Sequence, residues 1–318
     1  MAKYEYYFSH ARTALKQYIL KNNKDESSEI LLPDYLCETV PNTLKLLKNL
    51  KIIFYKINLD LTINWQDIND KISSKTKYLL IVNYFGFPLD IKKAVKFCKN
   101  YKILLVEDNT HGFNGFYEGT KLGNFGDIGI SSPRKHLPLK YGGVLYTNKA
   151  LTFNNDLLYS NTIFDRIKFK INHNYLNQKI FLQNIFLKKI SKINHYYEKE
   201  LDISSLDLFS MQIINNQNWN TLRKKKYSAF KSWQSFAFKN KLNALLSINA
   251  YKNINPWAFP VLLDSEKEVI KWLNWSKSKN IISFTWPTLS KDVIKNSDAY
   301  TLSKRVLCFS TYKTLNEI

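Results

Sequence analysis

Short apolar runs alternate with amphipathic segments along the first third of the chain. The runs at residues 29–33, 51–57 and 78–83 predict buried strands. Apolar residues recur at helical spacing over residues 9–20, 38–47, 65–72 and 91–101. Strands that alternate with helices in this way predict an α/β fold, with a mostly parallel central sheet and helices on both of its faces.

The pattern changes near residue 150. A stretch that extends to residue 206 is rich in aromatic residues, Asn and Lys. Beyond it, helical periodicity covers residues 212–239 and 265–279, and apolar runs at 258–263, 281–284 and 307–310 predict strands. We therefore expect a large domain over residues 1–206 and a smaller C-terminal α/β domain over residues 207–318.

Two adjacent carboxylates follow a further apolar run at residues 103–106. This run predicts a buried strand that ends on Glu107 and Asp108. Because successive strand side chains point to opposite faces, only one of the two can face a crevice at the carboxyl end of the strand. We assign this place to Asp108, and we expect Glu107→Gln to keep most of the activity.

A strand-end Asp with a Lys 27 residues further along suits pyridoxal phosphate. This cofactor needs an amine that holds its aldehyde as a Schiff base, and an acid that keeps its ring nitrogen protonated so that the ring accepts electrons. Asp108 and Lys135 are the candidate catalytic residues for these two tasks. Their spacing alone is weak support, because Asp and Lys are common surface residues.

The residues around this pair make the pattern more specific. After the Glu-Asp pair come, in order, His111, Gly126-Asp127, Ser132, Lys135 and Gly142-Gly143. This order resembles the DegT/DnrJ-type sugar aminotransferases, a branch of the fold-type I pyridoxal-phosphate enzymes. The resemblance implies a fold-type I aminotransferase.

The same resemblance implies roles for several of these residues. Lys135 would bind the aldehyde, Asp108 the ring nitrogen and His111 the phenolic side of the ring, with Ser132 as a further cofactor-binding residue. The spacing before the lysine differs from the family pattern: Lys135 follows Ser132 by three residues, where five is common in the family. This shorter loop leaves Lys140 as a fallback for the catalytic amine.

The start of the first predicted helix is a candidate phosphate site. Ala11, Arg12 and Thr13 bring a small residue, a cation and a hydroxyl to a helix end, where free N–H groups and the helix dipole favour an anion. In the family that the chain resembles, this place holds the cofactor phosphate. An ordinary amphipathic helix is the alternative interpretation of the same residues.

Two further family features are altered in this chain. Cys37 stands where an aromatic residue often stacks on the cofactor ring, so we expect the ring to be sandwiched in another way or more loosely. Residues 150–206 contain no clean equivalent of the Asn loop that reaches the partner subunit's phosphate.

Composition and charge argue against a nucleic-acid-binding, membrane-spanning, secreted or zinc-binding protein. The net charge of +21 suggests nucleic acid or an anionic surface, but the lysines are spread along the chain and no nucleic-acid module is recognisable, so we favour composition bias. No apolar run approaches the roughly 20 residues that span a bilayer, and the N-terminus lacks the apolar stretch of a signal peptide. The three cysteines form neither a zinc pattern nor a disulfide framework. We expect a cytoplasmic protein with reduced thiols, no metal site, and no nucleic-acid or membrane partner.

The resemblance implies a homodimeric aminotransferase that moves an amino group, with glutamate as the expected donor, to a nucleotide-linked keto sugar for surface polysaccharide synthesis. A sugar dehydratase that uses the same cofactor is one alternative, although such relatives carry His in place of the lysine. A catalytically degenerate relative that acts as a binding protein, or a basic nucleic-acid binder, is the other.

Overall fold

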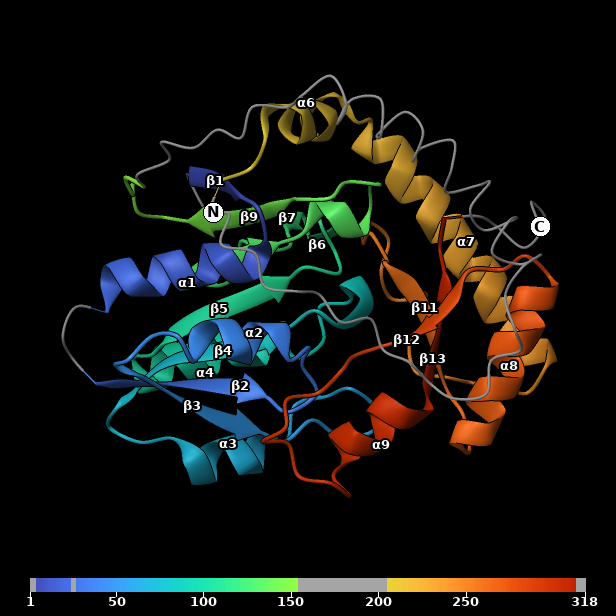
Figure 1. Cartoon of the computed structure of the whole chain (residues 1–318), viewed down its shortest axis with the longest axis horizontal. Helices are drawn as coiled ribbons and strands as arrows, with labels where there is room; N and C mark the ends of the chain where they lie inside the picture. Colours follow the sequence, from blue (N-terminus) through green and yellow to red (C-terminus); the bar gives the residue numbers. More distant parts are fainter. Residues whose placement is uncertain (1–3, 24–26, 154–204, 313–318) are drawn as a thin grey trace.

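The computed structural model describes residues 4–23, 27–153 and 205–312 of the 318-residue chain. Its larger sheet has seven strands in the order β1-β9-β8-β5-β4-β2-β3 (Figure 1). Strands β8, β5, β4, β2 and β3 run parallel, and β9 runs antiparallel to both of its neighbours. The predicted mostly parallel sheet is therefore confirmed. The strand bounds are Tyr4–Phe8 (β1), Ser28–Pro33 (β2), Leu50–Tyr55 (β3), Thr76–Val82 (β4), Leu104–Asn109 (β5), Ile128–Ser131 (β8) and Gly143–Thr147 (β9).

Helices cover both faces of this sheet, as predicted. Figure 1 shows α1 and α2 in front of the sheet and α4 behind it. In α4, Ile91, Ala94 and Cys98 recur at helical spacing and are buried, while the lysines between them are exposed. The bounds of the helices and of the small β6–β7 hairpin are Ala11–Asn22 (α1), Thr39–Leu44 (α2), Trp65–Lys71 (α3), Tyr84–Gly86 (3-10 helix η1), Ile91–Tyr101 (α4), Phe116–Tyr117 (β6), Thr120–Lys121 (β7) and Pro133–Lys135 (3-10 helix η2).

The second sheet has four antiparallel strands in the order β10-β11-β13-β12. Helices α7 and α8 pack against it, and α7 runs along its outer side in Figure 1. The bounds are Leu208–Asn216 (α6), Trp219–Lys239 (α7), Asn243–Ala244 (β10), Ala258–Leu262 (β11), Glu266–Ser278 (α8), Ser283–Thr285 (β12), Asp298–Arg305 (α9) and Val306–Ser310 (β13).

Two details of the C-terminal half differ from the sequence-based prediction. The single helix predicted over residues 212–239 is wrong, because the chain breaks between α6 and α7. Asn218 causes the break: its side chain accepts a hydrogen bond from the backbone N–H of Thr221 and caps α7. Helix α9 was not predicted. The domain boundary at residue 206 stays a prediction, and it adjoins residues 154–204, which lie outside the described part.

The two sheets meet at η1. The backbone N–H of Trp257 donates to the carbonyl of Phe85 at 3.0 Å. Gly86 permits this approach, because it has φ +93° and a Cβ built on it would lie 2.7 Å from the carbonyl oxygen of Asn255. The loop before β11 is thereby held against the ends of the parallel strands. Within the described ranges, no helix has the length and apolar character needed to cross a bilayer.

Candidate active site

A cavity of about 590 Å³ lies at the carboxyl ends of the parallel strands. Its walls come from the start of α1, the turn after β2, the ends of β4, β5 and β8, η2, and the segment around Trp286. Open α/β sheets bind ligands at this edge. The strands position its polar groups, because their carboxyl ends meet there.

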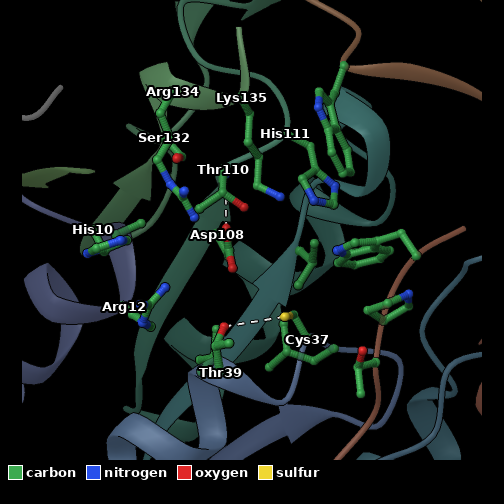
Figure 2. A pocket seen from close by; sticks show the side chains of 18 of the residues that line it. His10, Arg12, Cys37, Thr39, Asp108, Thr110, His111, Ser132, Arg134 and Lys135 are labelled. Carbon is green, nitrogen blue, oxygen red and sulfur yellow. Dashed lines mark hydrogen bonds between the residues drawn. The ribbon is translucent and has the colours of Figure 1, made fainter. Parts of the chain in front are cut away.

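Strand β5 turns its two carboxylates to opposite sides, as predicted. Asp108 lines the cavity, and its Oδ1 accepts a hydrogen bond from the backbone N–H of Thr110 at 2.9 Å (Figure 2). Burial raises the pKa of Asp108, while hydrogen bonds from Thr110 and the positive charge of Lys135 act in the opposite direction. The cavity thus contains one buried carboxylate whose charged form is favoured first by Thr110 and then by Lys135.

Glu107 does not line the cavity but anchors the chain behind it. Its Oε1 accepts from the Asn83 side chain at 2.8 Å and from the Gly123 N–H at 2.7 Å. Its Oε2 accepts from the N–H groups of Phe125 and Gly126, at 2.8 and 3.3 Å. A fully buried carboxylate with four donors stabilises the fold, so the Gln substitution, which we expect to keep most of the activity, will lower the stability of the protein.

Lys135 reaches the cavity from η2, directly after β8. Figure 2 shows its side chain extending toward Thr110 and His111. Its Nζ lies 4.0 Å from the centroid of the Trp257 ring. Lys140, the fallback candidate, does not line the cavity; it is exposed, and its Nζ lies 4.9 Å from the centroid of the Tyr141 ring. The shortened loop therefore still places Lys135 in the cavity.

Ser132 lines the cavity beside Lys135 and fixes the loop. Its hydroxyl donates to the carbonyl of Gly142 at 3.1 Å. The following Gly143 passes so close to α1 that a Cβ on it would lie 2.1 Å from the carbonyl carbon of His10. The Gly-Gly pair therefore lets β9 and the lysine loop approach the start of the helix.

His111 is buried in a neutral form with a defined tautomer. Its Nδ1 accepts the backbone N–H of Phe85 at 3.1 Å, so the ring proton is on Nε2. Burial, followed by the charges of Lys135 and His136, keeps the pKa of His111 well below its usual range. Its ring stacks on Trp257, with centroids 4.4 Å apart. His111 can thus donate one hydrogen bond from Nε2.

The start of α1 forms a positive end of the cavity. His10, Ala11 and Arg12 line it, whereas Thr13 is half-buried in the same turn and is not among the lining residues. The first helical hydrogen bond runs from the Ala14 N–H to the His10 carbonyl, and no side chain caps the helix at His10. The N–H groups of the first helical turn point toward this end of the cavity and do not bond within the helix, an arrangement that favours an anion.

Arg134 adds a second guanidinium near this end. In Figure 2 it lies on the same side of Asp108 as His10 and Arg12, and it lines the same cavity. Our sequence analysis missed Arg134, although its place beside Lys135 in the short loop was a usable signal.

Two tryptophans provide the flat aromatic surfaces of the cavity, where Cys37 stands in place of the stacking aromatic residue. Cys37 lines the cavity with its Sγ 3.3 Å from the hydroxyl of Thr39 (Figure 2). The large flat surfaces come instead from Trp257 and Trp286, and the Trp286 ring packs edge-on against His111 with centroids 4.6 Å apart. Trp286-Pro287 resembles a Trp-Pro turn of the same family, but this resemblance does not place its ring in the cavity, and no local sequence signal points to Trp257. Residues 150–206, where the family has its Asn loop, lie mostly outside the described residues.

Sequence comparison connects the chain to sugar-modifying enzymes. Residues 21–185 match the sequence model of the DegT/DnrJ/EryC1/StrS aminotransferase family. GDP-perosamine synthase of Escherichia coli O157:H7 is 28% identical over 142 residues, which cover 44% of this chain and 39% of that protein. The UDP-4-amino-4,6-dideoxy-N-acetyl-beta-L-altrosamine transaminase of Campylobacter jejuni serotype O:23/36 is 24% identical over 193 residues, or 57% of this chain and 50% of that protein. These alignments span half or less of each relative.

Structure comparison extends the similarity to nearly the whole chain. PseC of Helicobacter pylori, an aminotransferase of pseudoaminic acid biosynthesis, superposes with a TM-score of 0.68 at 15% identity over 99% of this chain and 84% of that one. The E. coli GDP-4-keto-6-deoxy-D-mannose-3-dehydratase superposes with a TM-score of 0.67 at 18% identity over 99% and 86%. At these identities the likeness shows a shared fold.

Proposed function

Because the chain belongs to the DegT/DnrJ/EryC1/StrS aminotransferase family, we propose that it is a pyridoxal-phosphate-dependent aminotransferase that transfers an amino group to a nucleotide-linked keto sugar. The observation that carries the proposal is the convergence of Asp108, His111 and Lys135 in one cavity with a positive helix end. The similarity to GDP-perosamine synthase and to the UDP-sugar transaminase supports the substrate class and a place in surface polysaccharide synthesis.

The residues present fit this cofactor. The uncapped N-terminus of α1, with Arg12 and Arg134 nearby, suits the phosphate. Asp108 suits the ring nitrogen, the Nε2–H of His111 suits the phenolic oxygen, and Lys135 suits the aldehyde. When bound, pyridoxal phosphate supplies an electron sink for the pair released as a donor's Cα proton leaves.

The chain's own side chains would then supply the charge, the proton transfer and the exclusion of water that the reaction needs. The negative charge of Asp108 favours a protonated ring nitrogen, as an opposite charge does for any titrating group. The Nζ of Lys135 acts as a nucleophile and as a general base and acid for the Cα proton. Trp257 and Trp286 exclude water from the side of the cavity that Lys135 faces.

Dehydration of the sugar is the main alternative chemistry on this fold. Family members of that type carry His in place of the catalytic lysine. Lys135 lies in the cavity, and this favours amino transfer.

We further propose that the enzyme is a homodimer with glutamate as amino donor and that it works in the cytoplasm. The three free cysteines, Cys37, Cys98 and Cys308, fit a reducing compartment. A two-fold dimer would bring the same surface of both subunits together. Light scattering of the purified protein at micromolar concentration should give twice the monomer mass; a fully active monomer would remove this part of the proposal.

The deciding experiment uses the purified protein with pyridoxal phosphate. We expect a visible absorbance band from cofactor joined to a lysine, and glutamate-dependent amination of a nucleotide-linked 4-keto-6-deoxy sugar, detected by mass spectrometry. Borohydride should fix the cofactor to the peptide that carries Lys135. Lys135→Ala should abolish turnover and still bind cofactor, and Lys140→Ala is the matched control that keeps activity. Trapping on Lys140, or no band and no turnover in the wild type, would contradict the proposal.

A further inference from the structure

A second group of buried basic side chains lies behind Lys135, outside the cavity lining. Lys226, from α7, is fully buried, and its Nζ has no hydrogen-bond partner among the described residues. This Nζ lies 4.2 Å from the centroid of the Tyr312 ring. The hydroxyl of Tyr312 donates to the backbone carbonyl of Lys135 at 3.2 Å. One aromatic ring therefore connects a buried ammonium to the backbone of the candidate catalytic lysine.

His136 completes this group and stays neutral. Neither of its ring nitrogens forms a hydrogen bond of good geometry in the part of the chain that the structure describes, and the polar group that faces the ring is the backbone of His111. Burial, followed by the charges of Lys226 and Lys135, keeps the pKa of His136 well below its usual range. Among the described residues, the titratable groups beside Lys226 are the neutral imidazole of His136 and the phenol of Tyr312. In the described ranges, no carboxylate forms an ion pair with this ammonium.

The segment after β13 joins three parts of the site. The Thr311 hydroxyl lies 2.8 Å from the carbonyl oxygen of Pro256 and 2.9 Å from that of Trp257. The indole N–H of Trp233, in α7, donates to the Ser310 carbonyl at 3.0 Å. Tyr312 then reaches the carbonyl of Lys135. The segment therefore links α7, the loop that carries Trp257, and the loop that carries the lysine.

An ammonium in this position destabilises the fold. Burial disfavours the charged form and lowers the pKa of Lys226 to about 7, and no carboxylate in the described ranges offsets this effect with an ion pair. An apolar side chain of the same length would fill the space without this cost. What the ammonium does contact is the face of the Tyr312 ring, where a desolvated cation is attracted by the π-electrons.

We propose that Lys226 and Tyr312 are positioning residues for Lys135: the amine end of Lys226 packs on the face of the ring and fixes it, and the ring's hydroxyl fixes the carbonyl of the residue whose side chain enters the cavity. Only the catalytic role of Lys135 in this inference rests on the proposed function. A lysine loop that is free to shift by a fraction of an ångström would align its amine poorly, and misplacement of about 1 Å can cost 10²-fold in rate.

The test compares Tyr312→Phe and Lys226→Met with a control variant in which another lysine that lies over a tyrosine ring is replaced. Tyr312→Phe removes only the hydroxyl, and Lys226→Met removes the amine and leaves an apolar side chain that is one atom shorter. The control is Lys304→Met, because the Nζ of Lys304 lies 5.7 Å from the centroid of the Tyr300 ring on α9, away from the cavity. We measure kcat and KM, the melting temperature, and hydrogen–deuterium exchange of the cofactor-free protein.

We expect both site variants to lower kcat by about tenfold with KM changed less than about twofold, while the control is unaffected. The double variant should be no worse than the poorer single variant, because both act through one ring. Lys226→Met should also raise the melting temperature, by about 2 °C or more. In the cofactor-free variants, the amides of His136 and Leu137, which bond to the Pro133 carbonyl, should exchange faster than in the wild type.

The exchange measurement separates this inference from the proposed function. If the wild type catalyses no amino transfer, the proposed function fails, and unchanged exchange at residues 136–137 would independently overturn the positioning role. Site variants with wild-type kcat would also overturn it. So would a Lys226→Met protein that melts at a lower temperature and exchanges faster throughout, because that result indicates a general structural role.

Discussion

Substituting Glu107 by Gln tests whether the register of β5 is understood. The change keeps the size of the side chain and removes its charge. In the folded protein two donors approach each carboxylate oxygen, namely Asn83 and Gly123 on one and Phe125 and Gly126 on the other. A Gln has one oxygen and one NH₂ group, so whichever way it turns, the NH₂ faces two N–H donors.

The expected loss follows from these contacts. Two hydrogen bonds to a charged acceptor disappear, and each contributes roughly 1.5–3 kcal/mol. Burial raises the pKa of Glu107, so removing the charge recovers part of this loss. We therefore expect a fall of about 3 kcal/mol in the free energy of unfolding, or roughly 4–5 °C in the melting temperature of a chain of this length.

Thermal unfolding followed by circular dichroism measures this change. Glu118→Gln is the matched control: the Glu118 carboxylate is exposed and contacts Lys92 at 2.6 Å, so its melting temperature should stay within about 1 °C of the wild type. At a temperature where it is folded, Glu107→Gln should keep most of its activity, because residue 107 faces away from the cavity. A variant that is as stable as the wild type but inactive would show that the strand register is wrong by one residue.

Three further predictions address the site and its surroundings. Asp108→Asn should lower kcat by roughly 10²–10⁴, about 3–5.5 kcal/mol of transition-state stabilisation, with cofactor still bound by absorbance; near-wild-type kcat would refute its role. Gly143→Ala should weaken cofactor binding at least about tenfold in a fluorescence titration, because a Cβ there meets the carbonyl carbon of His10 at 2.1 Å, and unaltered affinity would show that α1 is not the phosphate site. Burial lowers the pKa of Lys226 from 10.5 to about 7, so between these pH values the unfolded chain holds a proton that the folded protein has lost, and the free energy of unfolding rises with pH. In denaturant titrations of Lys226→Met, the free energy of unfolding should lack this part of the rise with pH. A dependence on pH identical to that of the wild type would contradict the prediction.

Local sequence patterns predicted the parallel sheet and the candidate residues Asp108, His111 and Lys135. The alternation of strands and helices predicted the parallel sheet, because each element buries a face that its own residue spacing defines. The two-residue period of β5 placed Asp108 in the cavity and Glu107 behind it, as the structure shows. The placement of His111 and Lys135 followed from motif order along one short stretch. All of these signals come from residues close together in the chain.

Only the tertiary structure decided what surrounds these groups. Trp257 and Trp286 face Lys135 because the second sheet packs against η1, and no spacing in the sequence encodes that contact. The same packing brings Lys226 and Tyr312 behind the lysine. In the sequence alone Lys226 is one of many lysines, since burial and loss of partners are properties of a packed interior. The sequence by itself therefore determined which residues are the candidates for the chemistry, and long-range packing decided what holds them in place.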